Sequence, residues 1–495
     1  MKKLINYRFS YPLVVGTLLG ILTCKFFYSE NYEILILDVA LVALFVFFFY
    51  SEKKRLILSL IAFVVFFAIA FLLYRVLFEH YSSIKFSGSN VYYVSGKVKS
   101  VAYYEDYVYV KLSNATIDYA YNPVSTSLVV YVENGSAMEL GDRIGFYSTV
   151  TRAFSASDPS LLYEGITYKT SVNIEDVTYL GSKLNVFEKC NVYVKNLFFS
   201  YMDESVAGIA YAMLTGTTSF IPKDANNLYR FAGIAHIFSV SGLHISFISH
   251  FLNKLTKKIP VKQIYKTVVI IAVLLFYSGI CNFTASSLRA VIMCSVLLLC
   301  QSFSKKYDIL NATLLSMAVL LLTNPFSFFN VGFQLSYLSV LGIIILANPF
   351  NRLLKFMPEK ISSSVSVSLS SCIITLPVTM RVFGYFSPVS FLYNLVIIPI
   401  IYVIFLGLII TLLASFIVKL KAVFFLADKT LIAINKLLRG TNPERMIIKG
   451  LSFGYGVAFY YSSVIISGDL INLKTTKKLI ISSFFIIICL LFLIF

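Results

Sequence analysis

Apolar runs of about 18 residues or more recur along most of this chain, and a helix needs about 20 such residues to cross a bilayer. The 495 residues are 58% hydrophobic and only 13% charged, with a mean hydropathy of +0.81. Soluble domains are about half apolar and about a quarter charged. A transmembrane strand barrel would show short alternating segments instead. The sequence therefore predicts a polytopic α-helical membrane protein.

The apolar runs predict a series of spans. They cover about residues 9–28, 33–50, 56–78, 232–252, 267–283, 286–303, 308–323, 331–349, 361–380, 388–417, 449–467 and 479–495. Basic loops such as 51–55 and 351–360 alternate with apolar or small-polar turns, and Lys and Arg collect on the cytoplasmic side of a membrane. This alternation predicts a cytoplasmic N-terminus and an exit to the other side after the third span. Residues 422–440 could form an interfacial helix or a short span.

Residues 80–185 differ from the rest, because long apolar runs are replaced by short β-branched and tyrosine-rich runs. "DYVYVKL" and "TSLVVYVENGS" alternate, and Asn134-Gly135 and Gly141-Asp142 are turn signals. Several short strands at this spacing predict a small barrel, of which the five-stranded OB-fold is one design. The predicted fold is thus a polytopic helical membrane protein with an extracytoplasmic OB-like domain inserted after the third span.

Tyrosines crowd this predicted barrel, and neighbours along a strand point to opposite faces, so about half face outward. Tyr93, Tyr104, Tyr107 and Tyr109 are candidates for stacking on the bases of a single strand, at about 1–3 kcal/mol per base. Alternatively, the rings fill the barrel core and contact the membrane surface. The net charge of +18 indicates nucleic acid only weakly, because the cytoplasmic loops hold most of the excess.

The chain divides into five predicted regions. Residues 186–231 carry apolar positions at helical spacing among charges, which predicts amphipathic helices on the membrane surface. The regions are transmembrane helices at 1–79, the OB-like domain at 80–185, these interfacial helices at 186–231, a transmembrane domain at 232–417, and an amphipathic helix with transmembrane helices at 418–495.

The segment "AHIFSVSGLHISFI" at 235–248 is apolar enough to enter a bilayer, yet Ser241-Gly242 interrupts it. Polar groups at membrane depth face a bundle interior or a wet cavity, because facing lipid costs several kcal/mol. A broken helix also frees backbone groups that are tolerated only where they are buried or line water. His236, Ser239, Ser241, Gly242 and His244 would then line a pore. The alternative, equally supported by the residues, is a tight helix crossing at small side chains.

Three further polar residues lie in predicted spans. Arg289 is near the outer end of its span, so its guanidinium could reach the interface or form a fixed positive charge that attracts phosphates at a channel mouth. Gln334 and Asn394 could line the same path, although such amides more often bond helices together. The sequence contains no phosphate-binding loop and no HExxH or HxHxDH cluster. We therefore expect no metal, no cofactor and no enzymatic activity, and directed transport would need a partner or a gradient.

Four ordered blocks resemble the bacterial competence protein ComEC family. They read "AYAMLTGTTSFIP…LYRFAGIAHIFSVSGLHISF", "SSLRAVIM", "NPFSFFNVGFQLSYLSVLGI" and "TLPVTMRVFGYFSPVSFLYNLVIIP". The resemblance is strong over about 200–400 and implies a channel domain at 232–417 that carries single-stranded DNA across the bacterial cytoplasmic membrane during natural transformation. It also implies a competence DNA receptor on the outer side, a cytosolic ATP-driven motor and a separate nuclease. The chain resembles the short form of the family, because the metal motif of the metallo-β-lactamase-like domain is absent.

Two other functions fit parts of the sequence. A secondary transporter of a small anion can also place a broken helix at the membrane midplane, but related halves and acidic residues within the spans are missing. "SVSGLH" is similar to the GxSG of intramembrane serine hydrolases, in which a membrane-embedded serine pairs with a histidine on another helix. Here the nearest histidine follows Ser241 on the same segment, so this alternative is remote.

Overall fold

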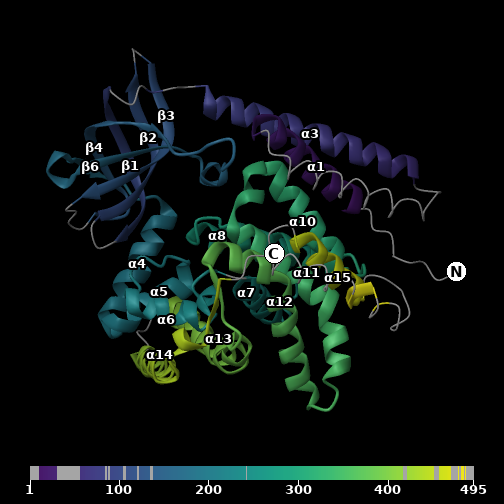
Figure 1. Ribbon diagram of the computed structural model, residues 1–495. Coiled ribbons are helices and arrows are strands. Elements are labelled where there is room, and N and C mark those ends of the chain that lie inside the picture. The colour runs from purple at the N-terminus through teal and green to yellow at the C-terminus, as the bar shows by residue number, and fades with distance from the viewer. Residues whose placement is uncertain are drawn as a thin grey trace.

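The computed structural model describes residues 10–29, 56–83, 86, 90–103, 107–119, 122–133, 138–240, 242–415, 421–450, 456–469, 478, 481–483 and 485. It contains a helical body, a β-sheet domain at one corner, and two N-terminal helices that lie along the upper side of the body (Figure 1). The predicted span at 33–50 lies outside the described residues, as does most of the span at 479–495.

Seven of the described helices are long and apolar enough to cross a membrane. They are α1 (Ser10–Ser29), α3 (Leu56–Ser82), α8 (Gln263–Ile280), α9 (Ala285–Ser302), α11 (Val331–Leu353), α12 (Glu359–Phe383) and α13 (Ser390–Ala414). An eighth apolar helix, α10 (Ile309–Thr323), has only 15 residues. The chain is therefore a multi-pass helical membrane protein.

The described residues of the sheet domain form seven strands. They are β1 (Val91–Tyr103), β2 (Tyr107–Tyr119), β3 (Asn122–Glu133), β4 (Asp142–Thr149), β5 (Thr151–Arg152), β6 (Ile166–Asn173) and β7 (Thr178–Ser182), in the order β5-β6-β3-β2-β1-β4-β7. The β3–β6 pair is parallel and all other neighbours are antiparallel. Alternate residues such as Val108, Val110 and Leu112 fill one core, as the period of two requires.

The prediction of a closed barrel is wrong, because this sheet is open. β7 pairs with the first half of β4, so β6 can contact β4 only near the carboxyl-terminal end of β4. There the contact is made by side chains: the Ser148 hydroxyl donates to the Ser171 carbonyl at 2.7 Å, and the Thr170 hydroxyl donates to the Thr149 carbonyl at 2.7 Å. No backbone ladder joins the two strands, and the OB-like assignment is not established.

Three helices follow the sheet: α4 (Val186–Tyr201), α5 (Glu204–Thr215) and α6 (Lys223–Phe231). Asn185 and Glu188 form a capping box that starts α4. All ten residues of α5 from Val206 to Thr215 are buried, and most of them belong to a hydrophobic cluster that also includes residues of α4, α6, α13 and α14 (Lys421–Thr441). The predicted amphipathic pattern of 186–231 therefore does not hold for α5, which is a core helix.

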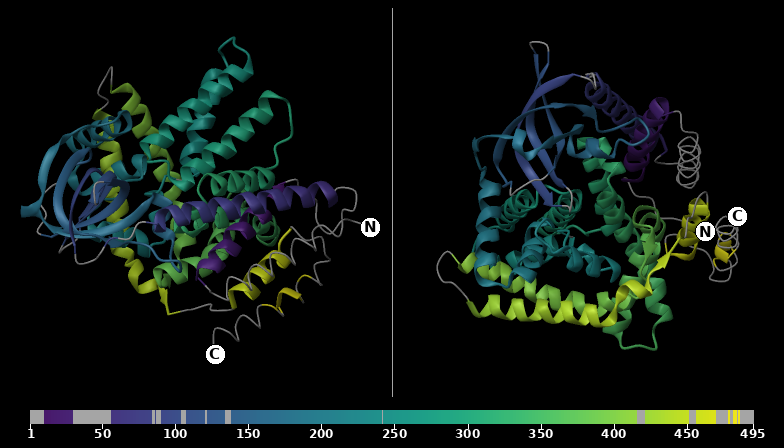
Figure 2. Two further views of the ribbon diagram at one scale, coloured as in Figure 1. Left: turned by 90° about the horizontal axis from the view of Figure 1, so that it is seen from above. Right: turned by 60° about the vertical axis from the view of Figure 1, so that its left-hand side comes forward.

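The long helix α14 occupies the segment for which the sequence left two alternatives. Phe424, Leu431 and Leu438 are buried on one face, whereas Phe425 and Leu426 on the other are 64% and 66% exposed. The helix is not among the seven that could cross a membrane, which favours an interfacial position. It runs along the lower edge of the right-hand view in Figure 2.

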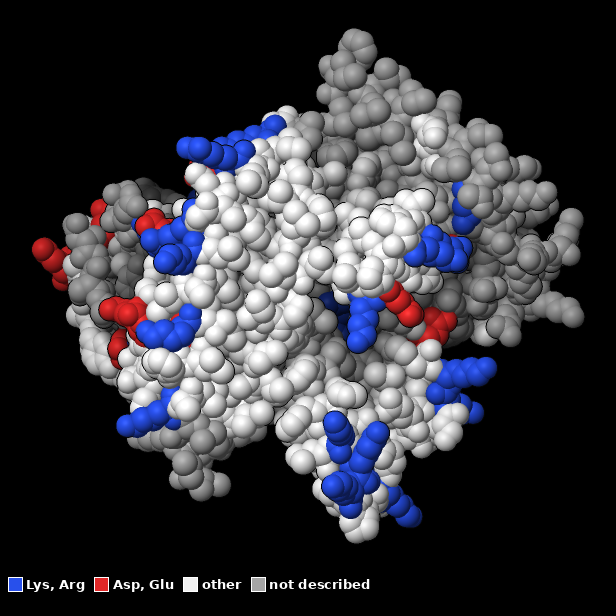
Figure 3. Space-filling view, turned by 90° about the horizontal axis from the view of Figure 1, so that it is seen from below, with Lys and Arg blue, Asp and Glu red and all other residues white. Residues whose placement is uncertain are grey.

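The rest of the C-terminal region contributes short elements. A two-residue strand β8 (Tyr385–Phe386) pairs antiparallel with β9 (Ile448–Lys449), and α15 (Gly456–Ser467) packs against α11 and α12. On the face shown in Figure 3, Lys and Arg form small separate groups divided by broad uncharged surface. A surface of this kind fits a protein that contacts lipid.

Candidate functional site at the start of α7

The interrupted segment predicted at 232–252 is not a continuous helix. A short 3-10 turn, η4 (Ala235–Ile237), is followed by α7 (Gly242–Thr256), a helix of 15 residues that begins at Gly242. Ser241 lies outside the described residues, so its predicted role stays a prediction. The helix start falls where the sequence places the break, because glycine and the polar residues before it disfavour a continuous apolar helix.

Helices α7 and α9 lie side by side and run in the same direction. The Ser246 hydroxyl lies 3.7 Å from the Cys294 sulfur, and the Asn253 amide donates to the Gln301 side-chain oxygen at 3.2 Å. At the amino-terminal end of α9, the Ser286 hydroxyl donates to the Val240 carbonyl at 2.9 Å. The amino-terminal ends of both helices therefore lie together.

Arg289 lies at this shared end and is 6% exposed. Its guanidinium carbon is 5.6 Å from the centre of the Tyr337 ring on α11. On the other side, a Cβ atom built on Gly242 would lie 3.1 Å from Nη2 of Arg289. The interpretation that this side chain reaches the membrane interface is therefore wrong: the guanidinium turns inward, between α7 and α11.

The Tyr337 hydroxyl lies 3.1 Å from the hydroxyl of Ser316, which is fully buried on α10. The Arg289 side chain of α9 thus lies against α7 and α11, and Tyr337 links it to α10. The buried Nε of Arg289 donates to no acceptor among the described residues. The sequence marked Arg289 as a candidate but did not indicate Tyr337 or Ser316 as its neighbours.

The two histidines of the motif have different surroundings. His244 is 4% exposed, and its ring centre is 4.3 Å from that of Phe405 on α13. His236 and Ser239 are exposed. His236 lies close enough to His244 to interact with it electrostatically. The break thus separates a packed histidine from an accessible one.

Gln334 and Asn394 make contacts elsewhere. The Gln334 amide donates at 2.9 Å to the Phe328 carbonyl, in the turn before α11. The Asn394 amide donates at 3.4 Å to the Ser368 hydroxyl on α12, and its buried carbonyl oxygen has no partner among the described residues. Neither contact involves Gly242, His244 or Arg289, so both amides tie neighbouring segments together.

The tyrosines predicted to stack on bases form pairs on the sheet. Tyr107 and Tyr109 both pack edge-on against Tyr131, with ring centres 5.4 and 5.6 Å apart. Tyr93 lies 5.0 Å from Tyr147 on β4. Tyr147 is 70% exposed and was not among the predicted stacking residues. Tyr104 lies outside the described residues.

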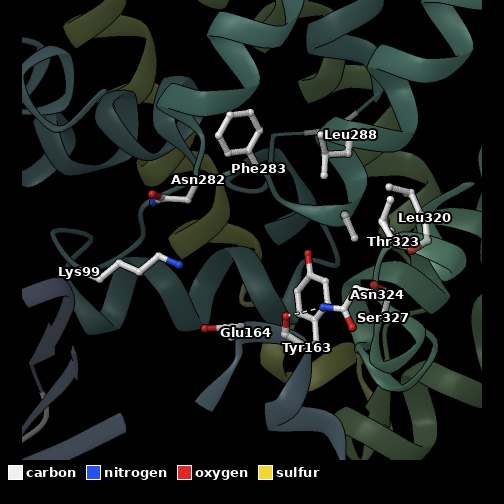
Figure 4. Close-up of a pocket in the computed structure, with 11 residues that line it drawn as sticks. Lys99, Tyr163, Glu164, Asn282, Phe283, Leu288, Leu320, Thr323, Asn324 and Ser327 are labelled. Atoms are coloured by element: carbon white, nitrogen blue, oxygen red, sulfur yellow. Dashed lines mark hydrogen bonds between the residues drawn. The ribbon is translucent and has the colours of Figure 1, made fainter. Parts of the chain in front are cut away.

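A cavity of about 240 Å³ lies where the sheet domain meets the helical body. Its wall includes Lys99 and Tyr163 from the sheet domain, and Asn282 and Asn324 from the turns after α8 and α10. Figure 4 shows Lys99 and Asn282 on one side and Tyr163 and Asn324 on the other. The Asn324 amide donates to the Tyr163 carbonyl at 2.9 Å, which joins the two bodies directly. Nothing in the sequence pattern predicted this polar junction.

Comparison with known proteins places the helical body in one family. Residues 213–493 match the Competence protein family. ComE operon protein 3 of Bacillus subtilis is 26% identical over 277 residues, which are 55% of this chain and 35% of that protein. The uncharacterized protein MG316 of Mycoplasma genitalium is 27% identical over 226 residues, 44% of this chain and 56% of that protein. The uncharacterized protein YcaI of Escherichia coli is 25% identical over 228 residues, 43% and 30% of the two chains.

The matched part thus spans less than two thirds of each of these relatives. No solved structure matches the chain. The family match nevertheless covers more than half of the 495 residues, including α7, Arg289 and Tyr337. The four sequence blocks predicted this result, and the chain belongs to the Competence protein family.

Proposed function

We propose that this protein conducts single-stranded DNA across the bacterial cytoplasmic membrane during natural transformation. The observation that carries the proposal is the family match over residues 213–493, which contains the interrupted polar segment. In this proposal the N-terminus is cytoplasmic and the sheet domain is extracytoplasmic.

The start of α7 supports a path for a polyanion in three ways. The backbone is not a continuous helix at this point, and irregular backbone at membrane depth is tolerated where it is buried or lines water. His236 and Ser239 are exposed beside it. The buried guanidinium of Arg289 supplies a positive charge at the same place. His236, Ser239, Ser241, Gly242, His244 and Arg289 are the proposed lining of the path.

The sheet domain would receive the strand before it enters the membrane. The exposed ring of Tyr147 and the row formed by Tyr107, Tyr131 and Tyr109 offer aromatic surface that stacks on any base. Lys99 lines the cavity at the junction with the helical body, where its ammonium can contact a phosphate. The strand would pass from these rings toward the α8–α9 turn.

Movement through this path needs energy from outside the chain, since the sequence contains no phosphate-binding loop. We assign this role to a cytosolic ATP-driven motor. A competence DNA receptor would deliver the DNA on the outer side, and a separate nuclease would remove the second strand.

The test measures the arrival of labelled DNA in the cytosol of a naturally transformable host. The gene for its own family member is deleted, and this chain is supplied in its place. We expect restored entry of DNA, with no change in DNA bound at the cell surface. Uptake of phosphorylated metabolites is measured in the same cells, as the alternative function. Uptake of these metabolites without DNA entry would contradict the proposal and indicate a small-anion transporter.

A further inference from the structure

We propose that Arg289 and the first turn of α7 form a binding site for one phosphodiester group. This inference rests on the proposed function for the identity of its ligand, a phosphate of the passing DNA strand. Its geometry rests on two independent features of the described residues: a helix amino-terminus and a buried cation directed at it.

The first feature is the amino-terminal end of α7. The first four N–H groups of a helix have no partner within the helix, and the helix dipole adds about half a positive charge there. Anions bind at such ends. α7 has 15 residues and begins at Gly242, which carries no side chain. The end of α9 lies beside it with the same direction, so both dipoles favour an anion at this place.

The second feature is the guanidinium of Arg289. The side chain is 6% exposed, its Nη2 lies next to Gly242, and its Nε is buried without an acceptor among the described residues. Within the part of the chain that the structure describes, no carboxylate forms an ion pair with Arg289. A buried charge without a partner is strongly unfavourable. A bound anion would remove that cost.

The neighbours of the guanidinium favour a phosphate over a fixed protein partner. Tyr337 offers the face of its ring, which stabilises a cation but does not satisfy its N–H donors. On the other side Gly242 has no side chain that could accept from the guanidinium. The planar fork of arginine matches two oxygens of a phosphate, and a lysine ammonium would not. The site therefore suits a singly charged phosphodiester held between the fork and the α7 amides.

The experiment measures binding of a labelled oligothymidylate to the full chain in nanodiscs of phosphatidylcholine. We expect R289Q to bind about 10- to 100-fold more weakly, the size of one or two charge-assisted hydrogen bonds. R381Q is the matched control, because Arg381 is exposed in the last turn of α12, and it should bind as the unchanged protein does. Equal affinity of R289Q and R381Q would overturn the proposal.

Three further arms test the site without removing Arg289. The unchanged protein should bind an uncharged methylphosphonate oligothymidylate far more weakly than the natural one, and equal binding would overturn the proposal. G242L should weaken binding as R289Q does, by displacing Nη2, whereas G242A should bind normally because the tip of a flexible side chain can move. Binding in G242L equal to that in G242A would contradict the site.

The last arm identifies the source of the phosphate. Nanodiscs that contain phosphatidylglycerol are compared with phosphatidylcholine alone. If the anionic lipid abolishes oligothymidylate binding in the unchanged protein, the site holds a lipid headgroup and the assignment to the strand is wrong. Unchanged binding supports the strand. DNA entry into cells is a separate measurement, so loss of transport with intact binding would refute the proposed function and leave the site standing.

Discussion

The α1–α3 and α7–α9 helix pairs both have a glycine at their contact, but the atoms that face the glycine differ. In the α1–α3 pair, a Cβ atom on Gly16 would lie 2.5 Å from the Phe63 carbonyl oxygen, and one on Gly20 would overlap the Phe67 carbonyl. In the α7–α9 pair, Gly242 meets the tip of the Arg289 side chain. Backbone cannot give way, but a flexible side chain can. The first pair is therefore a structural crossing, whereas the glycine of the second pair meets a side-chain tip that can move.

The largest effect that would separate the two pairs is on transport. Under the proposed function, R289E should reduce DNA entry into the cytosol by about 100-fold or more, because it replaces a phosphate-binding fork with a repelling charge. Entry of labelled DNA is measured at equal protein level in the membrane. R381E is the control and should retain most of the activity. Normal entry with R289E would show that the α7–α9 pair is as structural as the α1–α3 pair.

The second prediction concerns stability rather than transport. G20A should lower the free energy of unfolding by about 1–3 kcal/mol, because the added methyl overlaps the Phe67 carbonyl and forces α1 and α3 apart. Thermal unfolding of the purified protein in detergent measures this loss. G440A is the control, since a Cβ atom there would point into open space. An equal melting temperature for both variants would contradict the tight crossing.

The third prediction extends the comparison to the buried helix α5. The carboxylate of Asp428 on α14 accepts the N–H of Asp203 at 2.8 Å and is 7% exposed. D428A leaves this N–H without an acceptor and should cost about 1–3 kcal/mol. D428N keeps an acceptor oxygen and should lose less. The two melting temperatures test this ranking, and a larger loss in D428N than in D428A would disprove it.

The smallest effect concerns the cap of α5 and its response to pH. Asp203 accepts hydrogen bonds from the Ser205 hydroxyl and backbone N–H, which hold the pKa of its carboxyl below the usual range. A depressed pKa stabilises the folded state above the ordinary carboxyl pKa, and this contribution is lost as the pH falls through the folded value. D203N should therefore show a weaker loss of melting temperature between pH 6 and about pH 3. Parallel curves for both proteins would argue against the carboxylate cap.

Some features of these regions could be predicted from the sequence, and others could not. The length of the apolar runs predicted the helices that could cross a membrane, and the Ser241-Gly242 break predicted where α7 begins. Both are local signals, since span length and helix breaking depend on neighbouring residues. Arg289 stood out for a similar reason, as a charge inside an apolar run. The sequence did not predict that the Arg289 side chain turns inward, because a side chain that reaches the membrane interface fits the same local pattern.

The sheet and α5 show where local patterns fail. The alternation of residues predicted strands, but closure depends on which strand occupies the outer edge of β4, and β7 lies there in place of β6. α5 has the composition of a short apolar helix, and it became a core helix because α4, α6, α13 and α14 surround it. Of these partners, α13 and α14 come from a part of the chain that is distant in sequence.

Composition, span length and the ordered motifs by themselves determined that this chain is a helical membrane protein of the Competence family, because each is a property of residues close in sequence. Only the tertiary structure decided that Gly242, Arg289 and Tyr337 meet, and that the cation between them has no carboxylate partner among the described residues. Packing sets these contacts, because the direction of a buried side chain depends on the space that neighbouring helices leave for it.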